Sequence, residues 1–226
     1  MKTKQYYIDN LNVLYEDNHL IVVVKEPGVL SQKDNTNDLD IMTIIKEYLK
    51  VKYNKPGNVF LGLVHRLDRM TGGVMVFAKT SKCASRLSNQ IRNHEFEKKY
   101  LAVCYDSNIP LYGSLEDYIE VDEKTGISSI SKVGKYSLLE YNIIDKKDNL
   151  FLADITLKTG RHHQIRVQFA SRGCPLYGDN LYGNGPKVPL SLYAYSLKFK
   201  HPITSEELKF IKYPKNEIWN IFKLQK

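Results

Sequence analysis

The sequence has few of the features that mark secreted, membrane-spanning or metal-stabilised proteins. Its three cysteines, Cys83, Cys104 and Cys174, are odd in number and far apart in a chain of 226 residues. Cysteines in this pattern indicate neither a disulfide framework nor a CxxC metal site. No apolar run approaches the about 20 residues that span a bilayer, and residues 1–17 lack the apolar core of a secretory signal. We therefore expect a cytoplasmic protein that does not enter a membrane.

Glycine and proline are also few, with 13 and 8 residues, and no Pro/Gly-rich linker, internal repeat or low-complexity tract divides the chain. Apolar residues make up 42% of the sequence and charged residues 26%, as in an ordinary soluble globular protein. This composition supplies a sizeable core without disulfides or a structural metal. The sequence therefore predicts one domain over residues 1–226.

Positive charge, by contrast, is in excess. Lysine and arginine outnumber aspartate and glutamate by 33 to 25, which gives a net charge of +8. A basic surface attracts nucleic acid or an anionic membrane. Many lysines are scattered, as solvated surface residues are, whereas arginines gather at Arg66 and Arg69 and at Arg161, Arg166 and Arg172. The arginine groups are the more specific indication of an anionic partner.

Apolar periodicity predicts more strands than helices. The apolar face formed by Phe151, Ala153, Ile155 and Leu157 indicates a strand over residues 150–158. Further strands are expected within 11–25 (two strands), 60–65, 74–79, 97–105, 119–145, 193–199 and 208–213. Helices are expected from the N-cap Asp40 to before Asn54, after the N-cap Ser81, after Thr159-Gly160 and around Trp219. Hairpin-like connections outnumber βαβ units, so the sequence predicts an α+β fold, a mainly antiparallel sheet with helices on its faces.

A polar turn between two apolar strands contains the first candidate site. It reads His65-Arg66-Leu67-Asp68-Arg69-Met70-Thr71-Gly72-Gly73. The flanking arginines stabilise the anion of Asp68, which can then act as a nucleophile or a base. The same residues also suit an ordinary turn, in which Asp68 and Thr71 cap backbone N–H groups and the two glycines supply positive φ. The segment alone leaves both interpretations open.

The second candidate is the segment 158–166, Lys-Thr-Gly-Arg-His-His-Gln-Ile-Arg. A helix N-terminus that follows Thr-Gly and carries Arg161 and Arg166 is suited to bind an anion. The alternative is a capped helix with solvated arginines. The adjacent His162 and His163 would lie about 100° apart on a helix, and no Asp, Glu or Cys stands at ligand spacing. We therefore expect no metal site.

Both segments are similar to motifs of one family. HRLDRMTGGVMVFAKT resembles the motif HRLDxxTSGLLxFAK of the RluA-type pseudouridine synthases, and TGRHHQIRV resembles their TGRxHQIRxH motif. KEPGVLSQ, FEKKYLAV, PLYGDNLYG and LYAYSLKFKHPIT are similar to further motifs of that family in the same order. The resemblance spans residues 25–204, and the chain is identified as a member of the family on this basis.

The resemblance implies a fold, a reaction and a partner. The fold is the pseudouridine synthase fold, a mixed and mainly antiparallel β-sheet flanked by helices. The reaction converts a uridine of RNA into its C-glycoside isomer without a cofactor or a metal, after the base has left the helical stack. Many relatives carry an N-terminal S4 RNA-binding domain, but the first strand here begins by about Leu11, so we expect no S4 domain. The catalytic domain would then bind RNA itself, as a monomer without an obligate protein partner.

Positions that match the family motifs imply the catalytic residues. Asp68 is expected to attack the anomeric carbon of the ribose or otherwise to promote glycosidic cleavage. Arg166 is expected to pair with Asp68 and to hold it ionised and aimed. Tyr100, one of 16 tyrosines, is expected to stack on the uracil and to help remove the C5 proton. The alternative role of Tyr100 is packing.

Three further residues are implied to bind the substrate. Arg66 is expected to fill the space that the flipped base leaves, Ile165 to form a wall of the pocket, and Arg161 to contact phosphate. The chain departs from the family motifs at Gly72, where Ser is usual, and at Gln168, where His is usual. These departures concern a turn and local hydrogen bonds, not the catalytic set.

Two other classes of function compete with this interpretation. An N-glycosidase or nuclease would use an activated water and a separate general acid, and no second carboxylate accompanies Asp68 in its motif. A non-catalytic RNA-binding protein would not need Asp68, Tyr100 and Arg166, and all three are present. The resemblance leaves the target between ribosomal and transfer RNA, with a preference for ribosomal RNA.

Overall fold

The structure is a computed structural model that describes residues 3–36, 38–215 and 217–222, and the chain divides into two compact units. Unit 1 comprises Met1–Phe96 and Ser196–Lys212, and unit 2 comprises Glu97–Tyr195 and Tyr213–Lys226. Strand β10 (Leu192–Lys200) contributes its first residues to unit 2 and its last residues to unit 1. The prediction that residues 1–226 form one catalytic domain stays a prediction.

Unit 1 is built on strands that pair mainly in antiparallel fashion, and its central strands are buried. Its strands are β1 (Val13–Glu16), β2 (Leu20–Lys25), β3 (Gly62–Leu63), β4 (Gly72–Ala78), the end of β10, and β11 (Glu207–Ile211). They follow the order β1-β2-β4-β10, and β3 pairs also with β4 and β11 with β10. Every residue of β4 is buried, and β2 is buried except at Val24. Strands covered on both faces have such continuous apolar sequences.

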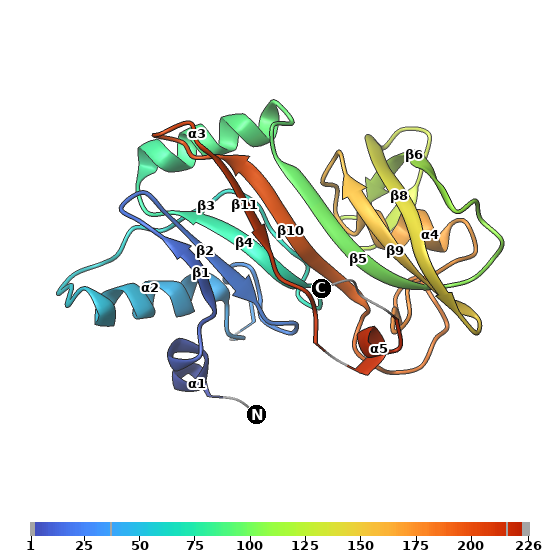
Figure 1. Ribbon diagram of the computed structural model, residues 1–226, viewed down its shortest axis with the longest axis horizontal. Helices are drawn as coiled ribbons and strands as arrows, with labels where there is room; N and C mark the ends of the chain where they lie inside the picture. Colours follow the sequence, from blue (N-terminus) through green and yellow to red (C-terminus); the bar gives the residue numbers. More distant parts are fainter. Residues whose placement is uncertain (1–2, 37, 216, 223–226) are drawn as a thin grey trace. The chain divides into compact units, whose positions relative to one another are not determined.

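The helices of unit 1 begin at side-chain caps. The carboxylate of Asp40 accepts the backbone N–H of Thr43 (3.0 Å), and α2 (Ile41–Lys52) buries Ile41, Ile44, Ile45 and Leu49. The predicted start at Asp40 is confirmed. Helix α3 (Ser81–Arg92) is capped by Thr80, so the prediction of Ser81 as its cap is wrong by one residue. Helix α3 lies beside β3 and β4, and α1 (Lys4–Asp9) lies beside α2 (Figure 1).

The core of unit 1 joins its strands to α3. It includes ten buried residues, Leu20, Val22, Val74, Val76, Ala78, Cys83, Leu87, Phe96, Leu197 and Phe199. The rings of Phe96 and Phe199 are stacked with centroids 5.0 Å apart, which fixes the end of β10 against the chain that leaves α3.

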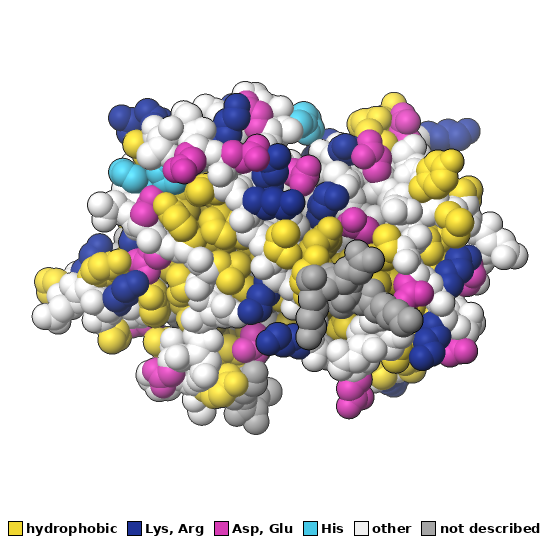
Figure 2. Space-filling model, viewed as in Figure 1, with side chains coloured by type: hydrophobic (Ala, Val, Ile, Leu, Met, Phe, Trp, Pro, Cys, Tyr) yellow, Lys and Arg dark blue, Asp and Glu magenta, His cyan; other side chains and the backbone are white. Residues whose placement is uncertain are grey.

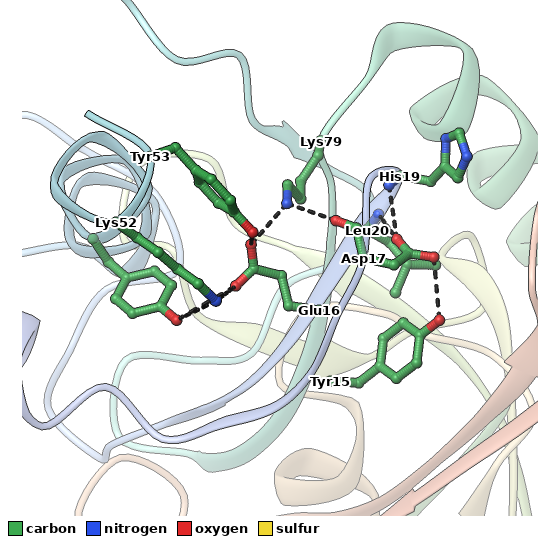
Figure 3. A network of polar contacts seen from close by, with 9 residues as sticks. Tyr15, Glu16, Asp17, His19, Leu20, Lys52, Tyr53 and Lys79 are labelled. Atoms are coloured by element: carbon green, nitrogen blue, oxygen red, sulfur yellow. Dashed lines mark hydrogen bonds and ion pairs between the residues drawn. The ribbon is translucent and has the colours of Figure 1, made fainter. Parts of the chain in front are cut away.

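A network of polar contacts surrounds Glu16 and Asp17 at the end of β1 (Figure 3). The carboxylate of Glu16, whose side chain is 5% exposed, accepts hydrogen bonds from Lys52 (2.7 Å), Lys79 (2.7 Å) and Tyr53 (2.7 Å). The next residue, Asp17, accepts the backbone N–H groups of His19 (2.7 Å) and Leu20 (2.8 Å) and so forms the turn between β1 and β2. Charged side chains thus tie β1 to α2 and to the end of β4.

Unit 2 contains antiparallel strands and two short helices. Its strands are the start of β10, β5 (Glu97–Tyr105), β6 (Tyr112–Val121), β7 (Ser128–Ile130), β8 (Lys135–Lys147) and β9 (Leu150–Leu157), in the order β10-β5-β9-β8-β6-β7. Helix α4 (Gln164–Ala170) lies beside β6 and β7, and α5 (Glu217–Asn220) buries Trp219. The ring of Phe169 from α4 contacts those of Tyr141 and Phe151 in the core.

The predicted fold class, an α+β fold with a mainly antiparallel sheet and helices, is confirmed. Strand boundaries at 97–105 and 150–157 agree with the apolar pattern. The strand expected over 60–65 is reduced to Gly62–Leu63, and the pairing expected from 119 already begins at Tyr112. Among the described residues, no helix has the length and apolar character needed to cross a membrane.

Charge on the surface is mixed. Dark blue lysine and arginine side chains lie next to magenta acidic ones across much of the face in Figure 2. Exposed pairs such as Lys158–Glu140 (2.9 Å) and Lys198–Glu207 (3.0 Å) are of this kind. Pairs of this type contribute little to stability. The mixture of charges on this face agrees with the expectation that many lysines are scattered and solvated.

Candidate active site

The loop that carries Arg66 and Asp68 joins β3 to β4 in unit 1. Its backbone is held at Leu67, where the hydroxyl of Ser31 accepts the Leu67 N–H (3.0 Å) and donates to the Leu67 carbonyl (2.6 Å). Beyond Asp68 the chain turns, because the N–H of Thr71 donates to the Asp68 carbonyl (3.0 Å). Arg66 is exposed and Asp68 is half-buried. Buried Leu67 thus anchors the loop between exposed Arg66 and half-buried Asp68.

A buried lysine supports the same loop from β2. The Lys25 ammonium, 0% exposed, donates to the carbonyls of Val29 (2.6 Å), Arg69 (3.0 Å) and Glu26 (3.2 Å). Burial lowers the pKa of Lys25 to about 7, the charge of Asp68 raises it, and that of Arg69 lowers it. Sequence reasoning missed Lys25 as a site residue, although a lysine that ends a buried strand before a turn is a signal of a buried cation.

The turn interpretation of the Asp68 segment is partly wrong. Gly73 has a positive φ of 136°, but Gly72 does not, so only one glycine of the pair is required by the backbone. The hydroxyl of Thr71 is buried and has no hydrogen-bond partner among the described residues, so it is not a cap. The loop is fixed instead by Ser31 and Lys25, which lie far from it in the sequence.

In unit 2, Arg161, Ile165 and Arg166 gather at the start of α4. Ile165 and Arg166 lie in the first turn of the helix and are 4% and 8% exposed, whereas Arg161 is exposed and its Nε–H donates to the carbonyl of Tyr136 (2.9 Å). The short helix expected after Thr159-Gly160 is present as α4, but it begins only at Gln164, so Arg161 precedes the helix and, of the two arginines, only Arg166 lies in its first turn. Its N-cap, His163, has a left-handed backbone (φ 51°) and makes no side-chain cap.

The two histidines therefore precede the helix. Their rings stack with centroids 3.8 Å apart. The expectation that the two side chains point about 100° apart on a helix is therefore wrong. Within the ranges 3–36, 38–215 and 217–222 no three His, Cys, Asp or Glu side chains are grouped to hold a metal ion.

Arg166 is bound by a carboxylate that sequence reasoning missed. Its Nε and Nη2 donate to the two oxygens of Asp179, at 2.7 and 2.8 Å. Burial alone would raise the pKa of Asp179, but the hydrogen bonds and charge of Arg166 outweigh burial and hold this pKa below its usual range. Asp179 belongs to the segment PLYGDNLYG, which is one of the motifs similar to the family, so its presence in that motif was the available signal.

The remaining predicted site residue, Tyr100, lies on β5 of unit 2, opposite Ile155 of β9, and is 7% exposed. Gln168, the departure from the family motif, donates through Nε2 to the carbonyl of Leu115 (3.0 Å) and to Asp117 (2.7 Å). The glutamine therefore makes specific hydrogen bonds at a position where histidine is usual.

The chain matches the family model described as RNA pseudouridylate synthase over residues 19–171. The chain belongs to the RNA pseudouridylate synthase family. The matched range contains Arg66, Asp68, Tyr100, Arg161 and the α4 residues Ile165 and Arg166, and it ends before Asp179. The family expected from the motifs is thereby confirmed.

Curated relatives agree with this assignment. The chain is 34% identical over 188 residues to ribosomal large subunit pseudouridine synthase C of Rickettsia bellii, covering 81% of this chain and 60% of the relative. It is 31% identical over 224 residues to ribosomal large subunit pseudouridine synthase D of Vibrio cholerae, covering 88% and 66%. The chain thus spans less than two thirds of the length of these relatives.

Solved structures show the same fold. The structure matches human RNA pseudouridylate synthase domain containing 4 with a TM-score of 0.79 and 23% identity, covering 94% of this chain and 93% of that chain. It matches human RNA pseudouridylate synthase domain containing 1 with a TM-score of 0.72 and 22% identity, covering 92% and 84%. The pseudouridine synthase fold predicted from the motifs is confirmed.

Proposed function

We propose that this protein is an RNA pseudouridine synthase that uses Asp68 to detach a uracil from its ribose and rejoin it through C5. The observation that carries the proposal is the Asp68 loop, whose backbone is fixed on both sides by Ser31 and Lys25 while the carboxylate stays half-buried rather than enclosed. Such support suits a group that must be held in one position for a reaction. Family membership, established over residues 19–171, gives the reaction class.

The proposed reaction is an isomerisation, so no atom or electron is gained or lost overall. Asp68 attacks the anomeric carbon or otherwise promotes cleavage of its bond to N1, the uracil turns over, and its C5 bonds to the anomeric carbon. Tyr100 stacks on the uracil and helps to remove the C5 proton, while N1 takes up a proton in exchange. Any bond formed between Asp68 and the anomeric carbon breaks as the bond to C5 forms. Arg166 pairs with Asp68 and keeps it ionised.

Substrate binding is assigned to three side chains. Arg66 fills the space that the flipped base leaves, and its exposure is compatible with insertion into RNA. Ile165, buried in the first turn of α4, forms a wall for the base. Arg161 contacts phosphate through Nη1 and Nη2, because its Nε–H is already used on Tyr136.

We propose ribosomal RNA as the target, because the relatives from Rickettsia bellii and Vibrio cholerae are named for the ribosomal large subunit. Transfer RNA is the second candidate target. The protein would act in the cytoplasm as a monomer, with RNA as its partner and with no cofactor or metal.

The decisive test is Asp68→Asn. The amide keeps the size and the turn of Asp68 but is a far weaker nucleophile and base, so we expect an unchanged melting temperature, nearly unchanged RNA affinity and no turnover. Tritium release from ribosomal and transfer RNA transcripts labelled with [5-³H]uridine measures turnover. Asp34→Asn, in an exposed turn of the same unit, is the matched control and should retain full activity.

The same assay separates the competing functions. Wild-type protein should release tritium in excess EDTA, because the proposed chemistry needs no metal. Free uracil as the product would indicate an N-glycosidase, and RNA binding without tritium release would indicate a non-catalytic RNA-binding protein. Normal turnover by folded Asp68→Asn protein would contradict the role of Asp68.

A further inference from the structure

The turn formed by residues 179–182 encloses the guanidinium of Arg166, and the proposed function gives this turn no role. We propose that Asp179 and Tyr182 are positioning residues, which fix the direction in which Arg166 presents its remaining N–H groups to the reacting carboxylate. The proposal rests on the proposed function, because it concerns the arginine that the function assigns to Asp68.

Asp179 is itself held by the backbone. Its Oδ1 accepts the N–H groups of Leu181 (3.0 Å) and Tyr182 (3.1 Å) as well as Nη2 of Arg166 (2.8 Å), and its Oδ2 accepts Nε of Arg166 (2.7 Å). The Asp179 side chain is 0% exposed. Its oxygens are therefore set by the path of the main chain, and they offer Arg166 one orientation.

The hydrogen bonds to Asp179 use one edge of the guanidinium. A guanidinium carries five N–H donors, and Asp179 takes those on Nε and one on Nη2. The other donors include one N–H on Nη2 and one on Nη1 along the adjacent edge of the guanidinium, and this pair fits a second carboxylate. The guanidinium carbon Cζ of Arg166 also lies over the ring of Tyr182, 5.0 Å from the ring centroid, in a cation–π contact.

Tyr182 is fixed in turn at its hydroxyl. The hydroxyl oxygen accepts the backbone N–H of Ser128 (2.8 Å), and its proton is then available to donate to Nδ1 of His163 (2.9 Å). This arrangement requires a neutral His163 with an unprotonated Nδ1. Burial and the charge of Arg166 lower the pKa of His163 to about 3, which agrees with that requirement. The Tyr182 hydroxyl is thus hydrogen-bonded both to Ser128 of β7 and to His163, the N-cap of α4.

Charge balance predicts a signature that a merely structural pair would lack. Asp179 partly compensates the charge of Arg166, so the arginine orients a second carboxylate and holds it ionised less strongly than an uncompensated arginine would. Replacing Asp179 by asparagine leaves the positive charge of Arg166 uncompensated. The anion of the reacting carboxylate should then persist to lower pH, while its orientation becomes poorer.

The experiment compares Asp179→Asn with wild type on ribosomal and transfer RNA transcripts labelled with [5-³H]uridine. We expect kcat to fall by about 50-fold, since small misplacements of a reacting group have effects of this order, with KM changed by less than about threefold. The acid limb of the pH profile of kcat/KM should move to lower pH. In an Arg166→Lys background the same change should reduce kcat by less than about threefold, because both substitutions then remove one interaction.

A matched control lies at the other end of α4. Asp117 pairs with Arg172 (2.6 Å) and also accepts Nε2 of Gln168, so Asp117→Asn should lower the melting temperature without changing kcat or the pH profile. An Asp179→Asn protein with the same behaviour, in the presence of normal wild-type turnover, would overturn the inference and leave the proposed function intact. A wild-type protein inactive on both RNAs would overturn the proposed function and the inference with it.

Should Asp179→Asn fail to fold, Tyr182 decides the question. Tyr182→Phe keeps the ring over Arg166 and loses only the hydroxyl, whereas Tyr182→Leu loses the ring as well. We expect kcat to decrease modestly in the first variant and by more than about tenfold in the second. Wild-type kcat in folded Tyr182→Leu protein would contradict the inference.

Discussion

Glu16 shows how one buried carboxylate can determine the acid stability of unit 1 (Figure 3). Burial alone would raise the pKa of Glu16, but hydrogen bonds from Lys52, Lys79 and Tyr53 outweigh burial and lower it to about 2. Glu16→Gln removes the charge and takes the carboxylate partner away from the largely buried ammonium of Lys79 and from the exposed one of Lys52. We expect the free energy of unfolding at pH 7 to fall by about 2 kcal/mol, measured by urea denaturation.

The pH dependence of this difference follows from the direction of the pKa shift. A folded-state pKa below the unfolded value means that the stabilisation is fully present above about pH 4.5 and is lost as the pH falls towards about 2. The gap between wild type and Glu16→Gln should therefore close between these values. Glu47→Gln, which alters an exposed pair with Lys4 (3.6 Å), should cost less than about 0.5 kcal/mol at any pH. A gap at pH 2.5 as large as the gap at pH 7 would contradict the assignment.

At the scale of single residues, the sequence indicates candidate reactive groups but not the residues that contact them. Asp68 and Arg166 stand out because charged residues in short motifs are recognisable without a structure. Lys25 and Asp179 are not recognisable in this way. Lys25 contacts the carbonyl of Arg69, 44 residues away, and Asp179 contacts Arg166, 13 residues away. The choice of such partners depends on which strands pair and which turns face them. Local sequence does not contain that information.

Helix α3 offers a test at the scale of one element. The Thr80 hydroxyl accepts the N–H of Cys83 (3.2 Å) from an extended backbone, whereas Ser81 is the first helical residue. Thr80→Ala should therefore lower the free energy of unfolding by about 1 kcal/mol, and Ser81→Ala should change it by less than about 0.5 kcal/mol. Thermal or urea denaturation of both variants checks this. A larger loss of stability in Ser81→Ala than in Thr80→Ala would instead support Ser81 as the N-cap, as the sequence predicts.

Elements were predictable where one periodicity dominated. The boundaries of β5 and β9 agree with the apolar pattern, since both strands are buried along most of their length. The observed boundaries differ from the predicted ones in two segments next to loops. Only Gly62–Leu63 pairs in the strand expected over 60–65, and α4 begins after the left-handed His163 rather than after Thr159-Gly160. The hydroxyl of Tyr182 contacts Nδ1 of His163 at the start of α4, and this hydrogen bond joins residues 19 positions apart in the sequence. A local pattern does not show such a contact.

At the scale of the whole molecule, the net charge is unevenly divided. Unit 1 holds 18 lysines and arginines against 12 acidic residues (18 − 12 = +6), and unit 2 holds 15 against 13 (15 − 13 = +2). Many of these side chains form exposed pairs or lie beside acidic neighbours (Figure 2). Net charge is therefore a weak basis for specific recognition, and the proposed phosphate contact is assigned to one side chain, Arg161.

RNA affinity should consequently depend on salt in a way that a single substitution can change. Each phosphate contact with single-stranded or loop RNA contributes a slope of about −0.7 to log K against log salt concentration. Several contacts are expected, and Arg161→Gln should make the slope less steep by about 0.7. Binding is measured with Asp68→Asn protein, so that turnover does not change the RNA during the titration.

The control for Arg161 is Lys124→Gln, which removes one positive charge from the exposed turn between β6 and β7. If net charge alone attracted RNA, both substitutions would weaken binding equally and leave the slope almost the same. A contact made by Arg161 predicts a different result, because the Nε–H bond to Tyr136 fixes its side chain and orients Nη1 and Nη2. The slope should then change for Arg161→Gln alone. An almost flat slope for the parent protein would mean that phosphate contacts do not carry recognition.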